Sequence, residues 1–330
     1  MQRDRSTACD LRIRRRTRRH ETGGDALMDL RRLHANDVFD ASGLVIALGF
    51  FDGMHTAHVR LLETAVAVAK ERGKTAALYT FSTHVLSHLR REPFFHLTSL
   101  SEKAAYAERL GFAKCIVFEV DDALVELEPE RFIERFLLGA EDVVIGFDYS
   151  FGRFGRGNAE LLQHDGRFPV TVVPEIAFYG KKIGSSRIRE ALAEGALALA
   201  TRLLGHPYRI EGEVGRGKGR GKILGFPTAN VDYDGYFLPR QGVYATRTWI
   251  GGKAYASMTN IGDNPTFAGN RITLEVNVFQ FRASLYGERI AVEFLAFVRD
   301  EAKYDSTAVL IDQMHHDERT VRSIFEKEEW

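Results

Sequence analysis

Residues 215–230 read GRGKGRGKILGFPTAN, and this stretch governs how the second half of the chain is interpreted. Glycines at 215, 217, 219 and 221 alternate with basic residues at 216, 218, 220 and 222. Glycine lets the backbone turn tightly and present its N–H groups to an anion, and the basic side chains add positive charge. Thr228 and Asn230 then offer oxygen atoms of the kind that Mg²⁺ accepts. The stretch therefore predicts a phosphate-binding loop followed by a metal site.

Three other interpretations of this stretch are open on its pattern. GEVGRGKG (212–219) nearly matches a P-loop, but Gly219 stands where Ser or Thr must bind magnesium, and its surroundings read as strands. An RGG-like RNA-binding patch would need aromatic side chains between its basic residues, so that bases could stack on them. The third interpretation is a solvent-exposed hairpin that binds neither phosphate nor RNA.

The remainder of the second half alternates polar and apolar residues over short segments. These segments are GVYATRTWI (242–250), ITLEVNVFQF (272–281) and RIAVEFLAFV (289–298). Gly, Asn and Pro turns separate them, which predicts a small antiparallel barrel or sandwich. Residues from about 305 to the end are expected to form closing helices.

The first half alternates buried-type strands with helical segments. Strands are expected at 44–50, 75–81, 115–120, 142–147 and 170–173, and helices at 58–72, 102–110, 129–138 and, broken by Gly195, 186–204. Such alternation predicts a parallel sheet covered on both faces. Pro207 cannot continue a helix, so we place the domain boundary there and expect domains at 36–204 and 205–330.

Further motifs follow the glycine-rich stretch. They are GVYA (242–245), NIGDNPTF (260–267), LEVNVF (274–279), LYGERIAVEFLAFVRDE (285–301) and KYDS (303–306). Taken in this order, residues 206–325 resemble the riboflavin kinase domain. The resemblance implies an all-β, six-stranded Greek-key barrel, with Mg²⁺ held by Thr228 and Asn230. It implies ATP phosphates on Gly217, Lys218, Gly219 and Gly221, and a flavin or nucleotide contact at Arg299.

The same resemblance assigns Glu275 as the general base. This carboxylate would take the proton from the terminal ribityl hydroxyl as that oxygen attacks the γ-phosphorus of ATP. The family usually has His two positions later, where Asn277 stands here. Both residues share one strand face, so we expect a change in tuning rather than a loss of activity.

GFFDGMHTAH (49–58) connects the first expected strand of the parallel sheet to its helix. Ligands of open α/β sheets bind at the carboxyl ends of the strands. His55 and His58 are three residues apart, so they fall on one face at the helix N-terminus, where free N–H groups favour an anion. The alternative is that the two histidines bind no anion, with one exposed at the surface and the other packed in the core. A zinc site lacks the HExxH spacing and a third ligand.

Later motifs extend this signature: TFSTH (80–84), LTSLSEK (97–103), VIGFDYSFGRFGRG (144–157) and IGSSRIREAL (183–192). In this order, residues 42–204 resemble the flavin adenylyltransferase domain of bacterial bifunctional enzymes, a nucleotidyltransferase with a Rossmann-like parallel sheet. The resemblance implies the following site residues: His55 and His58 at the α-phosphate, Asp52 in the same loop, Asp148 at the flavin phosphate or nucleotide, and Ser185, Ser186 and Arg187 at the triphosphate.

Five positions depart from that family pattern: Phe50, Ala57, Thr83, Val85 and Gly184. Ala57 adds a methyl group where the backbone approaches phosphate, and Phe50 removes a polar contact to the nucleotide. We expect adenylyl transfer to survive, because both histidines, Asp148 and Arg187 are present.

Composition and charge bound the remaining possibilities. Hydrophobic residues make up 45% and charged residues 27% of the chain, and the formal net charge is zero. Ten arginines and five acidic residues lie within 1–33, so residues 1–35 are expected to be a disordered basic extension, with Met28 as the true start. An RNA-binding arm or a transit-like segment are the alternatives. The chain has no apolar run of about 20 residues, and Cys9 and Cys115 have no metal or redox spacing, which predicts a cytoplasmic protein without a membrane span.

These observations predict a bifunctional enzyme that phosphorylates riboflavin to FMN and adenylates FMN to FAD, with ATP and Mg²⁺ in both steps. The alternatives are a riboflavin kinase with a degenerate N-terminal domain, and a flavin-sensing or RNA-binding regulator that uses the basic tail. Nucleic acid is otherwise not an expected partner. We expect a monomer or a weak homo-oligomer.

Overall fold

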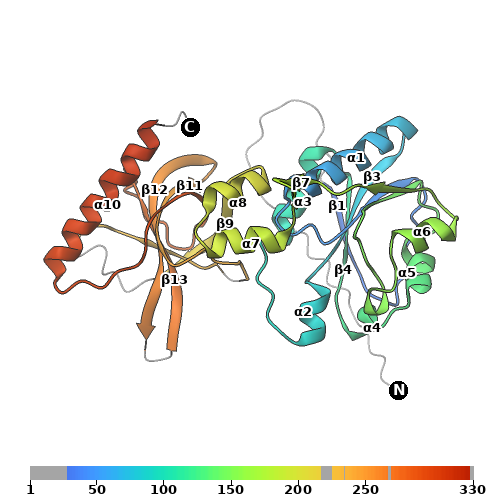
Figure 1. Ribbon diagram of the computed structural model, residues 1–330, viewed down its shortest axis with the longest axis horizontal. Helices are drawn as coiled ribbons and strands as arrows, with labels where there is room; N and C mark the ends of the chain where they lie inside the picture. Colours follow the sequence, from blue (N-terminus) through green and yellow to red (C-terminus); the bar gives the residue numbers. More distant parts are fainter. Residues whose placement is uncertain (1–27, 217–224, 234, 267–268, 328–330) are drawn as a thin grey trace, which may run out of the picture.

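The computed structural model describes residues 28–216, 225–233, 235–266 and 269–327. Two lobes lie side by side along the longest axis, with helices α7 (Ser185–Ala193) and α8 (Leu197–Leu204) between them (Figure 1). The arginine-rich stretch 1–27 lies outside the described residues, as do four of the expected phosphate-loop residues: Gly217, Lys218, Gly219 and Gly221.

The first lobe is built on a six-stranded parallel sheet in the order β1-β4-β3-β2-β5-β6. The strands are β1 (Asp29–Leu33), β2 (Leu44–Leu48), β3 (Thr75–Phe81), β4 (Lys114–Phe118), β5 (Asp142–Gly146) and β6 (Val170–Val173). All of β2 is buried, because its side chains alternate between two hydrophobic cores: Leu44, Ile46 and Leu48 enter one, and Val45 and Ala47 enter the other. The predicted parallel sheet, covered on both faces, is confirmed.

The first strand corrects the predicted extension. Residues 1–35 were expected to be disordered, but Asp29–Leu33 pair in parallel with β4 at the edge of the sheet. Lys114 is 3.2 Å from the Asp29 carboxylate, and Arg32 pairs with Glu119. The sequence DLRRL lacks the alternation of polar and apolar residues that predicts a strand, because an exposed edge strand needs no apolar face. The residues that stabilise this strand lie far away in the chain, so the local sequence does not indicate them.

Helices and a short hairpin complete the first lobe. They are α1 (Thr56–Arg72), α2 (Val85–Arg90), α3 (Leu100–Leu110), α4 (Asp122–Val125), α5 (Pro129–Phe136), η1 (Arg153–Gly155), α6 (Ala159–Asp165), and the hairpin of β7 (Ala177–Phe178) and β8 (Lys181–Lys182). Helix α1 buries Leu61, Leu62 and Ala65 and ends at Gly73, whose φ of 64° closes the last turn. Its N-terminus lies at the carboxyl end of β2, where the strand order reverses between β3 and β5. This is the place where open α/β sheets bind ligands.

Helices α7 and α8 pack against the second lobe. One hydrophobic core joins Leu203 and Leu204 of α8 to Tyr208, Ile210 and Phe294 of the barrel. The expected break at Gly195 is present, with φ of 75°. The shared core holds the two lobes against each other.

The second lobe is a closed antiparallel barrel in the order β10-β13-β12-β11-β14-β9. Its elements are β9 (Tyr208–Gly215), β10 (Ala229–Val231), β11 (Gly242–Ile250), β12 (Lys253–Thr266), β13 (Gly269–Val278), β14 (Arg289–Arg299) and α10 (Thr307–Lys327). Strand β14 returns beside β11, the first strand of the β11–β12–β13 meander, which is a Greek key. The predicted barrel is confirmed, and the closing helices are one helix, α10, over the described residues.

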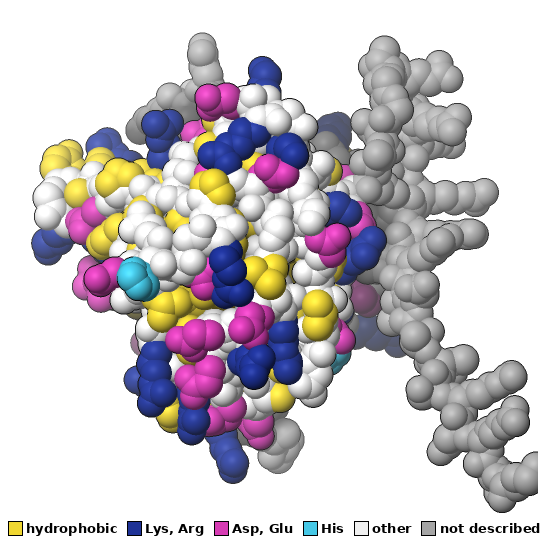
Figure 2. All heavy atoms as spheres, turned by 90° about the vertical axis from the view of Figure 1, so that its right-hand side faces the viewer, with side chains coloured by type: hydrophobic (Ala, Val, Ile, Leu, Met, Phe, Trp, Pro, Cys, Tyr) yellow, Lys and Arg dark blue, Asp and Glu magenta, His cyan; other side chains and the backbone are white. Residues whose placement is uncertain are grey.

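The surface of the first lobe carries both signs of charge. On the face in Figure 2, basic and acidic side chains are interspersed, as the zero net charge suggests. Among the described helices, none combines the length and the apolar character needed to cross a membrane.

Candidate functional site

Residues 49–55, which we call the histidine loop, leave the carboxyl end of β2 with a strained backbone. Phe51 and Met54 have positive φ values of 54° and 43°, and both side chains are buried. Side chains other than glycine rarely occupy this region, and strain of about 1–3 kcal/mol per residue persists only where surrounding contacts hold it. Among those contacts, the Asp52 carbonyl accepts a hydrogen bond from Ser185 Oγ at 2.8 Å, and Gly49 N–H donates to the Tyr79 carbonyl at 3.0 Å.

The two histidines meet at the start of α1. His55 caps the helix, and its Nδ1 accepts a hydrogen bond from the His58 backbone N–H at 3.3 Å. Their rings stack with centroids 3.5 Å apart and planes at 16°, so the prediction that they share one face is confirmed. Burial lowers the pKa of His55 to about 4, and burial, followed by the neighbouring His55, lowers the pKa of His58 well below its usual value. Both rings are therefore neutral at neutral pH, and each keeps one N–H to donate.

His58 lines three neighbouring cavities. The α7 cavity, about 370 Å³, lies between the histidine loop, α2 and the start of α7. The β5 cavity, about 230 Å³, lies between the end of β5, the start of α1 and β8. The apolar cavity, about 700 Å³, extends from the histidine loop under α2 and is lined largely by Leu, Val and Phe side chains. Three spaces of different polarity thus meet at one imidazole.

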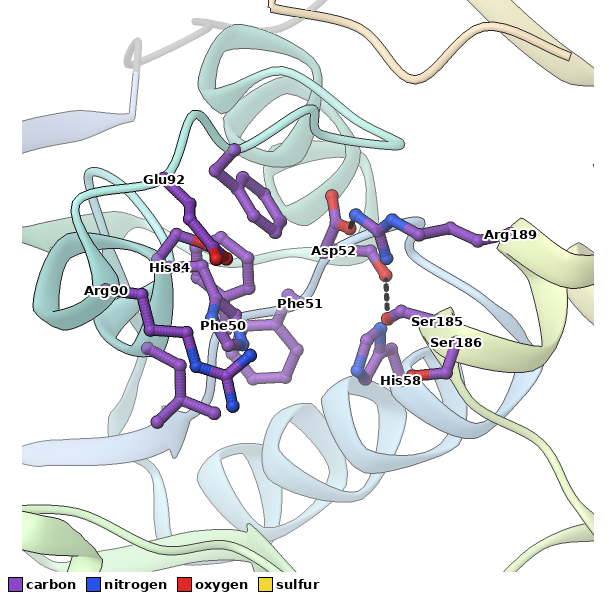
Figure 3. A pocket seen from close by; sticks show the side chains of 13 residues that line it. Phe50, Phe51, Asp52, His58, His84, Arg90, Glu92, Ser185, Ser186 and Arg189 are labelled. Carbon is purple, nitrogen blue, oxygen red and sulfur yellow. Dashed lines mark hydrogen bonds and ion pairs between the residues drawn. The ribbon is translucent and has the colours of Figure 1, made fainter. Parts of the chain in front are cut away.

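The α7 cavity is lined by hydroxyl groups and by two arginines, Arg90 and Arg189, together with the carboxylates of Asp52 and Glu92. In Figure 3, Ser185, Ser186 and Arg189 enter from α7 and face His58 and Asp52. Arg189 Nη2 lies 2.5 Å from Asp52 Oδ2, while Asp52 Oδ1 accepts the N–H groups of residues 97 and 98 at 2.8 and 3.3 Å. Asp52 is only 2% exposed and both of its oxygens are occupied, so it orients Arg189 and the loop rather than presenting a free carboxylate.

Asp148 follows β5 and lies at the border of the β5 and apolar cavities. Its carboxylate pairs with Lys182 of β8, whose ammonium also lies 5.1 Å from the Phe147 ring. The expected triphosphate residue Arg187 points elsewhere. Its guanidinium donates to the carbonyls of Phe178 and Lys181 at 3.0 and 2.9 Å and thereby holds the β7–β8 hairpin.

The second candidate site lies where β10 pairs with β13. Asn230 is the cross-strand partner of Glu275, and Thr228 Oγ1 lies 3.4 Å from Glu275 Oε2. These side chains bring hydroxyl, amide and carboxylate oxygens together, a donor set that fits a hard cation such as Mg²⁺. The buried Asn277 donates to the Pro227 carbonyl at 2.8 Å and fixes the backbone just before Thr228.

Comparison with known proteins places both sites in one family. Residues 39–187 match the FAD synthetase family, and residues 204–325 match the riboflavin kinase family. A bifunctional riboflavin kinase/FMN adenylyltransferase of Listeria monocytogenes is 38% identical over 86% of this chain and 93% of its own. The chain belongs to the bifunctional riboflavin kinase/FMN adenylyltransferase family.

Further members of the family and one solved structure agree with this placement. The Escherichia coli bifunctional riboflavin kinase/FMN adenylyltransferase is 33% identical over 90% of this chain and 97% of its own. A crystal structure described as a macrolide-efflux protein from Streptococcus pneumoniae is 31% identical, with a TM-score of 0.81 over 89% of this chain and 99% of that one. The whole two-lobed arrangement is therefore shared with that structure.

Phe50, one of the departures from the family pattern, belongs to an aromatic cluster at the α7 cavity. Its ring packs edge-on against His84 and Phe94, with centroids 5.2 and 5.3 Å away. The Lys103 ammonium lies 3.9 Å above the same ring and donates to the Phe50 carbonyl at 2.7 Å. Burial lowers the pKa of Lys103 to about 8. Lys103 thus holds Phe50 through both its carbonyl and its ring.

Two other departures from the family pattern, Gly184 and Ala57, lie at the edges of the cavities. Gly184 is the N-cap of α7 and provides no side-chain hydrogen bond, which leaves first-turn N–H groups of a nine-residue helix beside the cavity. Ala57 is half-buried and lines the β5 cavity.

The motifs did not single out two cations of the first lobe, Arg189 and Lys103, although both lie within quoted stretches. A helical count would have placed Arg189 on the same face as Ser185, four residues earlier, and Arg187 away from it. Lys103 carries no such signal, because its partner Phe50 is distant in the chain.

Arg299, the expected flavin or nucleotide contact, is engaged within the second lobe. Its guanidinium pairs with the buried carboxylate of Asp317 on α10, at 2.7 Å from Nη2 to Oδ2. The side chain therefore holds α10 against β14. A ligand would have to compete with that ion pair.

Proposed function

We propose that the first lobe transfers the adenylyl group of ATP to FMN and releases pyrophosphate. The observation that carries this proposal is the meeting of three cavities at His58. The apolar cavity suits a flavin ring system and the β5 cavity a nucleoside, while the α7 cavity offers serine hydroxyls and the Arg189 guanidinium to the terminal phosphates of ATP. This arrangement puts the reacting α-phosphorus beside the two imidazoles.

In this reaction an oxygen of the FMN phosphate bonds to the α-phosphorus of ATP. The bond from that phosphorus to the oxygen bridging to the β-phosphate breaks, and pyrophosphate leaves with the electron pair. No covalent enzyme intermediate is needed. His55 and His58 donate N–H groups to the oxygens on which charge develops.

The remaining residues of the first lobe position the substrates. Ser185, Ser186 and Arg189 hold the leaving pyrophosphate at the start of α7, where the helix N-terminus favours an anion. Arg187 supports this element from the β7–β8 hairpin, and Asp148 with Lys182 closes the β5 cavity.

The second lobe phosphorylates riboflavin with ATP. Glu275 accepts the proton of the terminal ribityl hydroxyl as that oxygen bonds to the γ-phosphorus, and ADP leaves. Thr228 and Asn230 would hold Mg²⁺, which when bound would neutralise charge on the ATP phosphates. Asn277 orients this segment through the Pro227 carbonyl. The phosphate cradle that the sequence predicts at Gly217, Lys218, Gly219 and Gly221 remains a proposal.

The cellular setting is also proposed. Cys115, the described cysteine, is a buried free thiol, which suits a reducing cytoplasm. A monomeric or weakly homo-oligomeric state stays a prediction.

One experiment tests both activities. The purified protein is incubated with riboflavin, ATP and MgCl₂, and flavins are resolved by chromatography over time. We expect FMN to rise first and FAD to follow. With Glu275→Gln, riboflavin should stay unconverted while supplied FMN still becomes FAD, and His58→Ala should show the opposite pattern.

Accumulation of FMN without FAD, even with excess ATP and added FMN, would leave a riboflavin kinase with a silent first lobe. That outcome would direct attention to Phe50, Ala57 and Gly184. Equal loss of both activities in either variant would contradict the assignment of one reaction to each lobe.

A further inference from the structure

A segment of the second lobe forms an isolated β-bridge with the first lobe beside the α7 cavity. His96 N–H donates to the Gly235 carbonyl at 2.7 Å, and Phe237 N–H donates to the His96 carbonyl at 2.9 Å. His96 and Tyr236 thus form a parallel bridge between the lobes. The first-lobe strand of this bridge continues directly into the Leu97 and Thr98 N–H groups that bind Asp52.

Tyr236 makes a second connection through its side chain. The residue is 3% exposed, its ring centroid lies 4.3 Å from that of His96, and its hydroxyl donates to Glu102 Oε2 at 2.5 Å. Glu102 also closes the capping box of α3 with Ser99. The next residue of that first turn is Lys103, whose ammonium supports the Phe50 carbonyl of the histidine loop.

Both connections end on the histidine loop, which holds Phe51 and Met54 at positive φ. Strain of this kind is retained only when the surroundings fix it. Residues 235–237 supply part of the contacts that fix the loop, and they lie within the region that matches the riboflavin kinase family. Phe237 also lies 5.7 Å from the guanidinium of Arg189 in the α7 cavity.

We propose that residues 235–237 of the kinase lobe are a positioning element of the adenylyltransferase site. This inference rests on the proposed function of the first lobe. Residues 235–237 touch neither substrate and act through α3, Asp52 and Arg189, which fix where the two catalytic imidazoles stand. The kinase lobe thus contributes to the second reaction of the pair as well as catalysing the first.

The adenylyltransferase site depends on the Tyr236 hydroxyl in this proposal, whereas the kinase site does not. The described contacts of Glu275 and Asn277 lie within the barrel and its β10 segment, at Thr228 and Pro227. A change in the Tyr236 hydroxyl should therefore reach the histidine loop and leave the kinase site unaltered.

The test compares two matched substitutions in the full-length protein. Tyr236→Phe removes the hydroxyl that reaches Glu102 and keeps the ring that packs on His96. Tyr233→Phe removes a hydroxyl that donates to the Ile272 carbonyl at 2.8 Å inside the kinase lobe, and serves as the control. Initial rates are measured for FAD formation from supplied FMN and for FMN formation from riboflavin, with kcat and KM for each substrate, together with the thermal midpoint.

We expect Tyr236→Phe to lower kcat for FAD formation by about 10- to 100-fold, because a misplacement of about 1 Å has effects of this size. KM for FMN and the rate of FMN formation should change less than about twofold, since neither site contacts the hydroxyl. Gly235→Ala should have a larger effect of the same kind. Gly235 has φ of 76°, and an added Cβ would lie 2.9 Å from the His96 ring.

Four results would overturn the inference. Wild-type kinetics of FAD formation in both Tyr236→Phe and Gly235→Ala would show that the segment positions nothing. Equal loss of both reactions, or an equal effect of Tyr233→Phe, would show a general structural role. A wild-type protein that forms no FAD from FMN would refute the proposed function itself, and this inference with it.

Discussion

Replacing Lys103 by Met should stabilise the protein near neutral pH and slow FAD formation. Lys103 is 3% exposed, and burial lowers its pKa from 10.5 to about 8. A pKa lowered this far corresponds to about 3 kcal/mol against the buried charge. The substitution also removes the hydrogen bond to the Phe50 carbonyl and the contact with its ring, which lowers the free energy of unfolding by about 1–2 kcal/mol. The net effect on the free energy of unfolding at pH 7 is a gain of about 1–2 kcal/mol.

The sign of the pH dependence follows from the same pKa. Between pH 8 and 10.5 the unfolded lysine still holds its proton while the folded one has lost it. Wild-type stability contributed by this group therefore rises through that window, and the Met variant has no such rise. The advantage of Lys103→Met should be full below about pH 8, disappear about one pH unit higher and reverse by about pH 10, because the wild type gains about 1.4 kcal/mol per pH unit in this window.

The assay is thermal unfolding of both proteins from pH 7 to pH 10, with the exposed Lys303→Met as the control. At pH 7 the midpoint of Lys103→Met should rise by a few degrees, at about 2–4 °C per kcal/mol. FAD formation from supplied FMN should fall, because the Phe50 carbonyl loses its charged donor. A variant that is less stable at pH 7, or one whose difference from wild type is constant up to pH 10, would refute the reasoning.

Three further predictions concern the polar groups around the two sites. Asn277→Ala leaves the Pro227 carbonyl without its side-chain donor, so we expect a loss of about 1–3 kcal/mol in denaturant unfolding and slower FMN formation, whereas normal rates would show that this contact is dispensable. His55 has its pKa lowered to about 4, so the unfolded chain takes up a proton first and stability should fall by up to about 3 kcal/mol as the pH drops from 6.5 to 4; a His55→Gln variant should lack that part of the slope in thermal unfolding. Arg189→Lys should reduce kcat for FAD formation about tenfold or more by losing its planar fork, and Arg187→Lys should reduce it less; the reverse order in steady-state assays would restore Arg187 as the phosphate contact.

The parts of the molecule that the sequence predicts are those whose causes are local. The strand predicted at 44–50 is a run of apolar residues, and its observed part, Leu44–Leu48, is wholly buried, so the loop that follows it must emerge at the carboxyl edge of a parallel sheet. His55 and His58 are three residues apart, so a helix start is sufficient to stack them. Asn230 and Glu275 could be placed together only through the resemblance to riboflavin kinase, because their pairing joins strands distant in the chain.

The parts that could not be predicted depend on contacts between distant segments. Arg31 and Arg32 look like a continuation of the basic tail, yet they belong to a strand because β4 offers an unpaired edge. Asp52 resembles a phosphate-loop residue, but the fold fills both of its oxygens with backbone N–H groups and Arg189. No local pattern of polarity reports which partner a carboxylate will find.

The same distinction applies to the contacts between the two lobes. The adenylyltransferase motif identifies the side chains proposed to contact the substrates. These lie in the seven residues of the histidine loop, 49–55, and in the first turn of α1. Holding such a loop against its own strain requires contacts from outside the motif, and here these come from α3, from α7 and from the segment that ends at Phe237. Substitutions at residues 235–237 should therefore change the rate of adenylyl transfer while every residue of the adenylyltransferase motifs stays in place.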